Sequence, residues 1–172
     1  MAMLVQDDSG GVVGANAYIS VLEMKDYWAT RGNDLASYTD DKLAVAIVLA
    51  TDYLDARFTF VGIKLRGRDQ STQWPRSSVW DRDRFYVNGI PPEVKEATAE
   101  YALRALTLDL NPDPVMDETG VAIQSKSETV GPISESVTYV SGATFTMPRY
   151  PAADQRLIRA GFVRAPGMVA RA

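Results

Sequence analysis

Three stretches of the chain carry hydrophobic residues at the spacing of an α-helix. The first begins at Ser20, which opens the sequence Ser-Val-Leu-Glu. This is a capping box, in which the Ser20 hydroxyl and the Glu23 carboxylate satisfy each other's backbone N–H groups. Gly32 follows the stretch and is typical of a helix end. The pattern therefore predicts a helix over about 21–31.

The second stretch follows Thr39, which precedes Asp40 and Asp41. These acids favour the positive end of a helix dipole, with Thr39 as the N-cap. The residues after them are apolar nearly all round, as shown by Leu43, Val45, Ile47, Val48, Leu49, Ala50 and Leu54. Because such a helix is normally buried on several sides, we expect it to be the central core helix.

The third stretch starts at Pro91 and Pro92, which are tolerated in a first helical turn, and stops before Pro112. One predicted face is apolar and contains Val94, Ala97, Tyr101, Ala105 and Leu108. The opposite predicted face is polar and contains Glu93, Glu96, Glu100, Arg104 and Thr107. The pattern predicts an amphipathic helix with one buried side.

The pattern changes after residue 114 to serines and threonines in partial alternation with Val130, Ile133, Val137 and Tyr139. This predicts two strands with a bend at Gly131–Pro132. Near the end, Pro151 favours a helix start and Gly161 a stop, so we expect one or two helical turns and a loose tail.

The predicted fold class is mainly α: a small helical bundle with a long structured loop, a β-hairpin and an extended C-terminal arm. The expected divisions are a helical core over 1–114 with an inserted loop over 57–89, a β-hairpin over 115–148, and a C-terminal arm over 149–172. The inserted loop is too long for an ordinary connection, which points to a structural or functional role.

The insertion is also the basic part of an acidic chain. The net charge is −4, yet residues 57–89 hold seven basic residues and three acids, a local charge of +4. Aromatic residues lie among the basic ones: Phe58, Phe60, Trp74, Trp80, Phe85 and Tyr86. Such a mixture is what proteins use to pair phosphates and stack bases of single-stranded nucleic acid.

Two interpretations of the insertion stay open. The candidate site residues of the insertion are either anchors that fix the loop to the core or contacts to DNA. They are Trp74, Arg76, Trp80, Arg82 and Arg84. A long loop needs buried aromatic side chains, and indole supplies a large apolar area with one donor. The charge of −8 carried by the rest of the chain would repel phosphate. We therefore favour the anchor interpretation.

The composition argues against several kinds of chemistry. The chain has no histidine and no cysteine, so imidazole catalysis, thiol nucleophiles, disulfides and zinc sites of the usual kinds are excluded. Asp52 with Asp55 is expected to be a solvated helix edge, and Asp81 with Asp83 is expected to pair with the neighbouring arginines. We expect no enzyme activity, no metal and no cofactor.

The start of the chain lacks a basic segment followed by an apolar one, and its longest apolar run, residues 43–50, is far shorter than the roughly 20 residues of a membrane span. We expect a soluble, unexported protein with no membrane partner.

The residues from 150 to 172 are apolar and basic, with four arginines against Asp154. One hypothesis is a segment that docks on a partner, through Tyr150, Arg156, Leu157, Ile158, Arg159, Phe162, Val163 and Arg164. The alternative is that Leu157 and Ile158 close the bottom of the helical core.

Five stretches together carry a resemblance to a known family. They are "ANAYISVLEMKDYWATRG", "AIVLATDYLDARFTFVG", "QWPRSSVWDRD" running to "IPPEVKEATAEYALRAL", "ETVGPISESVTYV" and "YPAADQRLIRAGF". In this order they resemble the head-to-tail connector (adaptor) proteins of tailed bacteriophages and prophages, and they cover most of residues 15–163. Members of this group are also labelled DnaT-like single-stranded-DNA-binding proteins.

The resemblance implies a subunit of a twelve-membered homo-oligomeric ring at the head–tail junction of a virion, assembled in the host bacterial cytoplasm. Its implied partners are the portal protein and a downstream neck or tail-completion protein, while genomic DNA passes through the lumen without specific binding. We expect such a structural connector first, and a single-stranded-DNA-binding protein that uses residues 57–89 as the alternative.

Overall fold

The computed structural model describes residues 2–113, 123–129, 134–139 and 150–164. The chain divides into two compact units, one made of Met1–Leu110 with Arg149–Ala172 and the other of Asn111–Pro148. The fold is mainly α, as predicted, with a two-stranded hairpin in the second unit. The segment predicted as a separate C-terminal arm belongs to the same unit as the helical core.

The described part of the first unit contains four helices: α1 (Val21–Ala29), α2 (Asp40–Arg57), α3 (Pro92–Ala105) and α4 (Pro151–Ala160). The capping box at Ser20 is present, and the Thr39 side chain caps α2. α4 has ten residues, more than the expected one or two turns, and it ends at Gly161 in the left-handed conformation. Local start and stop signals thus placed all four helices correctly.

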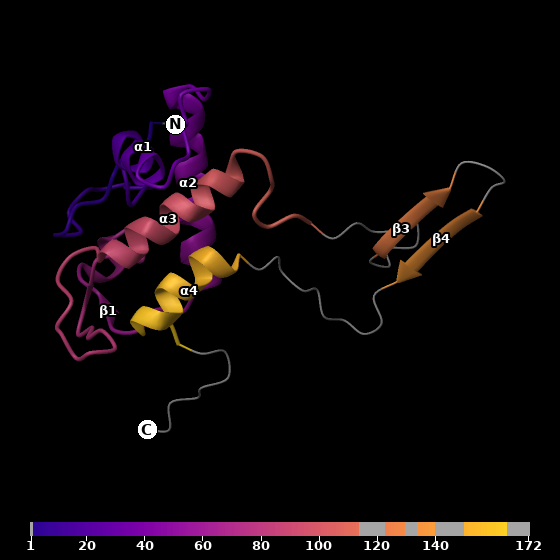
Figure 1. The fold of residues 1–172 in the computed structure, drawn as a ribbon. Coiled ribbons are helices and arrows are strands. Elements are labelled where there is room, and N and C mark those ends of the chain that lie inside the picture. Colours follow the sequence, from indigo (N-terminus) through magenta and orange to yellow (C-terminus); the bar gives the residue numbers. More distant parts are fainter. Residues whose placement is uncertain (1, 114–122, 130–133, 140–149, 165–172) are drawn as a thin grey trace. The chain divides into compact units, whose positions relative to one another are not determined.

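The core lies where α3 packs against α2 on one side and α4 on the other (Figure 1). α1 joins it through Trp28, whose indole N–H donates to the Ala99 carbonyl at 3.1 Å. The prediction that α2 is buried on several sides holds for most of its length, but Val45 and Leu49 are exposed. These two lie one turn apart on the side of α2 that α1 and α3 leave uncovered.

Two groups of ionic contacts fix α4 to the core. Buried Asp154 pairs with Arg57 at 2.8 Å and accepts a hydrogen bond from Tyr101. Two residues further along α4, Arg156 pairs with Glu96 and Glu100 of α3.

The prediction that Glu100 faces solvent is wrong, because Glu100 is 6% exposed. Its carboxylate accepts from Tyr27 at 2.8 Å and pairs with Arg104 at 3.0 Å and with Arg156. A buried charge is stable only with such partners, and here α1 and α4 supply two of them from distant parts of the chain.

The insertion between α2 and α3 contains three short elements: β1 (Ile63–Lys64), the 3₁₀ turn η1 (Gly67–Asp69) and β2 (Arg76–Ser77). β1 and β2 pair antiparallel, with Ile63 opposite Ser77. The N-terminal segment lies along the insertion and is bonded to it, for example from the Ser71 hydroxyl to the Ala15 carbonyl at 2.7 Å. The insertion is therefore a structured part of the first unit.

The second unit contains β3 (Ile123–Thr129) and β4 (Ser134–Tyr139), which pair antiparallel from Thr129 opposite Ser134 to Ile123 opposite Tyr139, with a register shift near Ile123. The two predicted strands are confirmed. The predicted bend at Gly131–Pro132 lies outside the described residues. Within the described parts of the chain, no helix has the length and apolarity needed to cross a bilayer.

Candidate nucleic-acid interface

Trp74 is an anchor of the insertion. Its side chain is completely buried and packs against Phe60 and Phe162, with ring centroids 5.8 and 5.4 Å away. Phe162 comes from the segment after α4, so the indole joins the insertion to the C-terminal part of the chain. The anchor interpretation is therefore right for Trp74, which cannot stack on a base.

The backbone beside Trp74 is bonded to Asp55, which lies in the last turn of α2. The Asp55 carboxylate accepts from the Gln73 N–H at 2.9 Å and from the Tyr18 hydroxyl at 2.5 Å, and that hydroxyl accepts from the Trp74 N–H at 3.0 Å. Burial is the main cause that raises the pKa of Asp55 to about 6. The prediction of a solvated edge is thus wrong for Asp55, and it holds for exposed Asp52.

Arg76 is the second anchor. Its guanidinium donates to the backbone carbonyls of Val61, Gly62 and Gln73 at 2.7 to 3.1 Å. Burial lowers the pKa of this arginine. With its donors committed to the loop backbone, Arg76 is a structural clamp and not a free phosphate contact.

The remaining candidates lie in residues 79–87, which we call the aromatic hairpin. Trp80 and Tyr86 are bridged across it, and the Val87 N–H donates to the Val79 carbonyl at 3.0 Å. At its tip the Arg84 N–H donates to the Asp81 carbonyl at 3.1 Å, and Arg84 itself has a φ of 68°. These bonds define a tight turn that presents its central residues to solvent.

Three aromatic side chains project from this hairpin into solvent. Trp80 is 53% exposed, Phe85 70% and Tyr86 50%. Trp80 and Tyr86 pack edge to face with centroids 5.5 Å apart, so each supports the other in a fixed orientation. Phe85 adjoins Tyr86 in the sequence and is the most exposed of the three. The hairpin therefore offers exposed aromatic surface on which a flat ring can stack.

The tip also carries exposed positive charge. Arg82 and Arg84 are exposed, and within the described residues neither forms an ion pair. The local ion pairs predicted with Asp81 and Asp83 are therefore not formed. Asp81 instead accepts from the Phe85 N–H at 2.8 Å and stabilises the turn.

The residues predicted to dock on a partner divide into two groups. Leu157 and Phe162 are buried, which supports the alternative that this segment closes the core, and Arg156 is paired with α3. Tyr150 and Val163 are half-buried and pack against the core. The exposed members are Ile158, Arg159 and Arg164.

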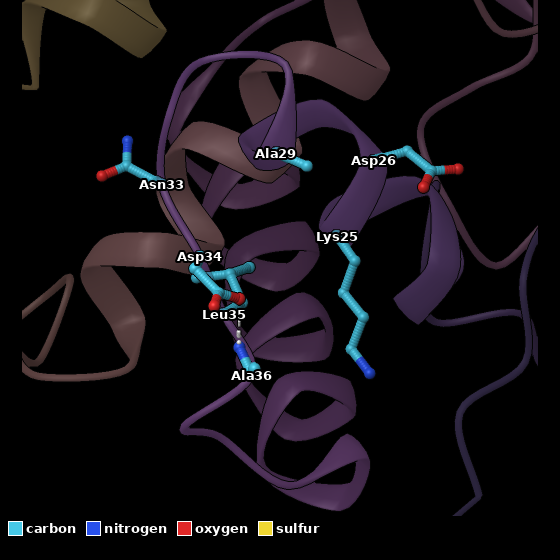
Figure 2. Close-up of a pocket in the computed structure, with 7 residues that line it drawn as sticks. All are labelled: Lys25, Asp26, Ala29, Asn33, Asp34, Leu35 and Ala36. Carbon is cyan, nitrogen blue, oxygen red and sulfur yellow. Dashed lines mark hydrogen bonds between the residues drawn. The ribbon is translucent and has the colours of Figure 1, made fainter.

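A hollow lies beside the C-terminal end of α1 (Figure 2), with a volume of about 190 Å³. It is lined by Lys25, Asp26, Ala29, Asn33, Asp34, Leu35 and Ala36. Lys25 pairs with Asp40, and the Asp34 carboxylate accepts from the Ala36 N–H at 2.8 Å. Among the described residues no group of three potential metal ligands exists. The polar groups that line this hollow serve local structure. The aromatic hairpin is therefore the stronger candidate for a binding site.

Phe85 and Tyr86 belong to the aromatic residues of the insertion, but they are not among the predicted site residues. Their alternation with the bridged Trp80 could have indicated a hairpin, since Trp80 and Phe85 flank an Asp-Arg-Asp-Arg turn.

A comparison with family models matched residues 1–171 to the family described as "Putative DnaT-like ssDNA binding protein". No curated protein matched the chain. No solved structure matched it either.

Proposed function

The chain belongs to the DnaT-like ssDNA binding family, and from this premise we propose that it binds single-stranded DNA through the aromatic hairpin. The observation that carries the proposal is the exposure of Trp80, Phe85 and Tyr86 beside two arginines that form no ion pair with any described residue. Stacking on an aromatic ring needs a base whose face is open, and only unpaired nucleotides offer one. The arginines supply phosphate contacts, which position the strand without reading its sequence.

The acidic net charge restricts this binding to a small area. Phosphate is attracted by the local +4 of residues 57–89 and repelled by the remainder of the chain. We therefore expect moderate affinity that falls steeply as salt rises. We also expect little preference between sequences, because every base has a π face.

The test is the binding of a fluorescein-labelled oligothymidylate, measured by anisotropy at low salt. Trp80→Ala is expected to weaken binding by about 1 to 3 kcal/mol, the usual contribution of one stacked base. Leu108→Ala is the control, because it removes an equally exposed apolar side chain outside the hairpin. Equal affinity of wild type and Trp80→Ala would contradict the proposal.

Tryptophan fluorescence gives a second readout. The chain has three tryptophans, of which Trp28 and Trp74 are buried and Trp80 is exposed. An unlabelled oligonucleotide is therefore expected to quench the emission of Trp80 alone. Trp80→Phe keeps an aromatic ring for stacking, so this variant should retain binding while the quenching disappears. Quenching that persists in Trp80→Phe would place the DNA elsewhere.

We propose a phage connector subunit as the second candidate function, supported by the resemblance of the sequence and by two features of the structure. Val45 and Leu49 expose apolar surface on α2, and exposed apolar patches often mark protein contacts. Residues 111–148 form a compact unit of their own, which gives the chain a second element for reaching neighbours. Under this proposal the subunit forms a ring that binds a portal protein.

Light scattering coupled to size-exclusion chromatography tests this candidate, on the chain alone and with a portal protein. The connector proposal expects a ring-sized species or a complex with the portal, and Val45→Glu should reduce it. Leu108→Glu is the matched control, because Leu108 is similarly exposed and lies three residues after the end of α3. A protein that stays monomeric both alone and in the presence of the portal protein would contradict the connector proposal and leave the DNA proposal intact.

A further inference from the structure

We infer that the single-stranded-DNA site is composite: Arg159 and Arg164, from the C-terminal end of α4 and the residues after it, form a second wall that holds phosphates beside the aromatic hairpin. This inference rests on the proposed DNA-binding function. It deepens that function by adding residues about 75 positions further along the chain.

A direct hydrogen bond joins the hairpin to the end of α4. The Arg82 N–H donates to the carbonyl of Ala160 at 3.1 Å. Arg82 and Arg159 are therefore on neighbouring backbone segments, and both side chains are exposed. The end of α4 lies beside the insertion (Figure 1). A helix C-terminus also has exposed carbonyls that favour a cation there, so Arg159 is stable at this place without an acidic partner.

The residues after α4 continue along the insertion. The Val61 N–H donates to the Phe162 carbonyl at 3.0 Å, and the Arg164 N–H donates to the Thr59 carbonyl at 2.8 Å. Buried Phe162 packs on Trp74, which fixes this segment to the anchored part of the loop. The backbone at Arg164 and two residues before it is thus bonded to the insertion, and the Arg164 side chain is exposed.

The charges of the first unit separate into two classes. Six arginines of the described part of this unit are engaged by acids or by backbone carbonyls: Arg31, Arg57, Arg66, Arg76, Arg104 and Arg156. Five others are exposed and form no ion pair among the described residues: Arg68 in η1, Arg82 and Arg84 in the aromatic hairpin, and Arg159 and Arg164 at the end of α4 and after it.

Burial is the main cause that lowers the pKa of Arg76, and the charge of Arg164 lowers it further, so the two arginines lie close to each other. Like charges brought together on one surface cost energy unless an anion neutralises them. A phosphate chain is an anion of the right shape, because its charges repeat along the strand.

The two walls have different chemical tasks. Stacking on Trp80 and its neighbours supplies affinity that salt changes little, whereas each arginine bound to phosphate adds to the salt dependence. For single strands, log K falls with log salt by about 0.7 per phosphate neutralised. Four arginines predict a slope of about −3, whereas the two hairpin arginines alone predict about −1.4.

The experiment measures oligothymidylate binding across a series of salt concentrations for the full chain and for Arg159→Gln/Arg164→Gln. We expect this double variant to lower the magnitude of the slope by about 1.4 and to bind at least about tenfold more weakly at low salt. Arg159→Lys/Arg164→Lys should keep the slope, since it keeps the charge. Lys42→Gln/Lys95→Gln is the control, because it removes two charges from other helices.

Circular dichroism and the melting temperature are expected to match wild type in both arginine variants, since Arg159 and Arg164 are exposed and make no side-chain ion pair among the described residues. An unchanged slope in the glutamine variant, with binding still lost in Trp80→Ala, would overturn the composite site and leave the hairpin proposal standing. A slope lowered equally by the lysine-to-glutamine control would also overturn it. Wild type that binds no oligonucleotide would overturn both proposals.

Discussion

Trp74 and Trp80 lie six positions apart in the same insertion and have opposite environments. Trp74 is completely buried between Phe60 and Phe162, whereas Trp80 is half exposed and contacts Tyr86 at the rim of a hairpin. The first indole stabilises the fold, and the second has a face available to a ligand. The anchor interpretation therefore applies to the part of the insertion around Trp74, and the surface-contact interpretation applies to the part around Trp80.

The arginines next to these tryptophans show the same contrast. Arg76 donates to three backbone carbonyls, and Arg82 has an exposed side chain with no ion pair among the described residues. Position relative to the core, and not residue type, separates an anchor from a surface contact. This contrast can be broken or sharpened by matched substitutions.

The largest expected effect is on stability at the two tryptophans. Trp74→Ala should lower the free energy of unfolding by about 3 to 5 kcal/mol, because it removes a fully buried indole and leaves a cavity. Trp80→Ala should lower it by less than about 1 kcal/mol, since Trp80 is half exposed and its removal ends the ring contact with Tyr86 without leaving a buried cavity. Urea denaturation followed by circular dichroism measures both.

Trp74→Phe sharpens this result. The indole N–H of Trp74 is buried and has no hydrogen-bond acceptor among the described residues. Phenylalanine removes this unpaired donor while it keeps an aromatic ring, so the loss should be smaller than for alanine. Similar losses for Trp74→Ala and Trp80→Ala would remove the distinction between anchor and exposed contact.

The next effect is a pH dependence of the free energy of unfolding, caused by Asp55 beside the anchor Trp74. Burial raises the pKa of Asp55 to about 6 in the folded chain from an ordinary 3.8. Between these values the folded state keeps a proton that the unfolded state has lost, so this group's contribution to stability is full below pH 4 and is lost as pH rises through 6. A shift of this size corresponds to up to about 3 kcal/mol.

Asp55→Asn removes this titration. Wild type should therefore gain stability relative to Asp55→Asn when the pH falls from 7 to 4, as measured by urea denaturation at each pH. Asp41→Asn is the control at an exposed position of the same helix. A constant difference between wild type and Asp55→Asn at all pH values would show that Asp55 keeps an ordinary pKa.

The smallest effect concerns the two arginines. Arg76→Lys should lower the free energy of unfolding by about 1 to 2 kcal/mol, because an ammonium cannot reach three carbonyls in the geometry of a planar guanidinium. Arg82→Lys should leave stability unchanged within about 0.5 kcal/mol. Thermal melting of the Arg76→Lys and Arg82→Lys variants measures the difference in their stability. An equal shift of the melting temperature in both variants would contradict the clamp role of Arg76.

The sequence by itself determined the features that depend on neighbours along the chain. The capping box at Ser20, the start of α4 at Pro151 and its end at Gly161 are set within one helical turn, so local chemistry predicts them. The two strands of the second unit follow from alternation in the same way. The basic and aromatic content of the insertion was also evident without any structure.

Only the tertiary structure decided which of these residues are buried. Glu100 and Asp55 have the spacing of solvent-facing residues, yet Tyr27 and Arg156 cover one, and Tyr18 and the backbone at Gln73 cover the other. Trp74 is buried because Phe162, nearly ninety positions later, packs on it, and Trp80 is left outside that contact. Burial depends on contacts between segments far apart in the chain, and composition and local spacing carry no information about which segments meet.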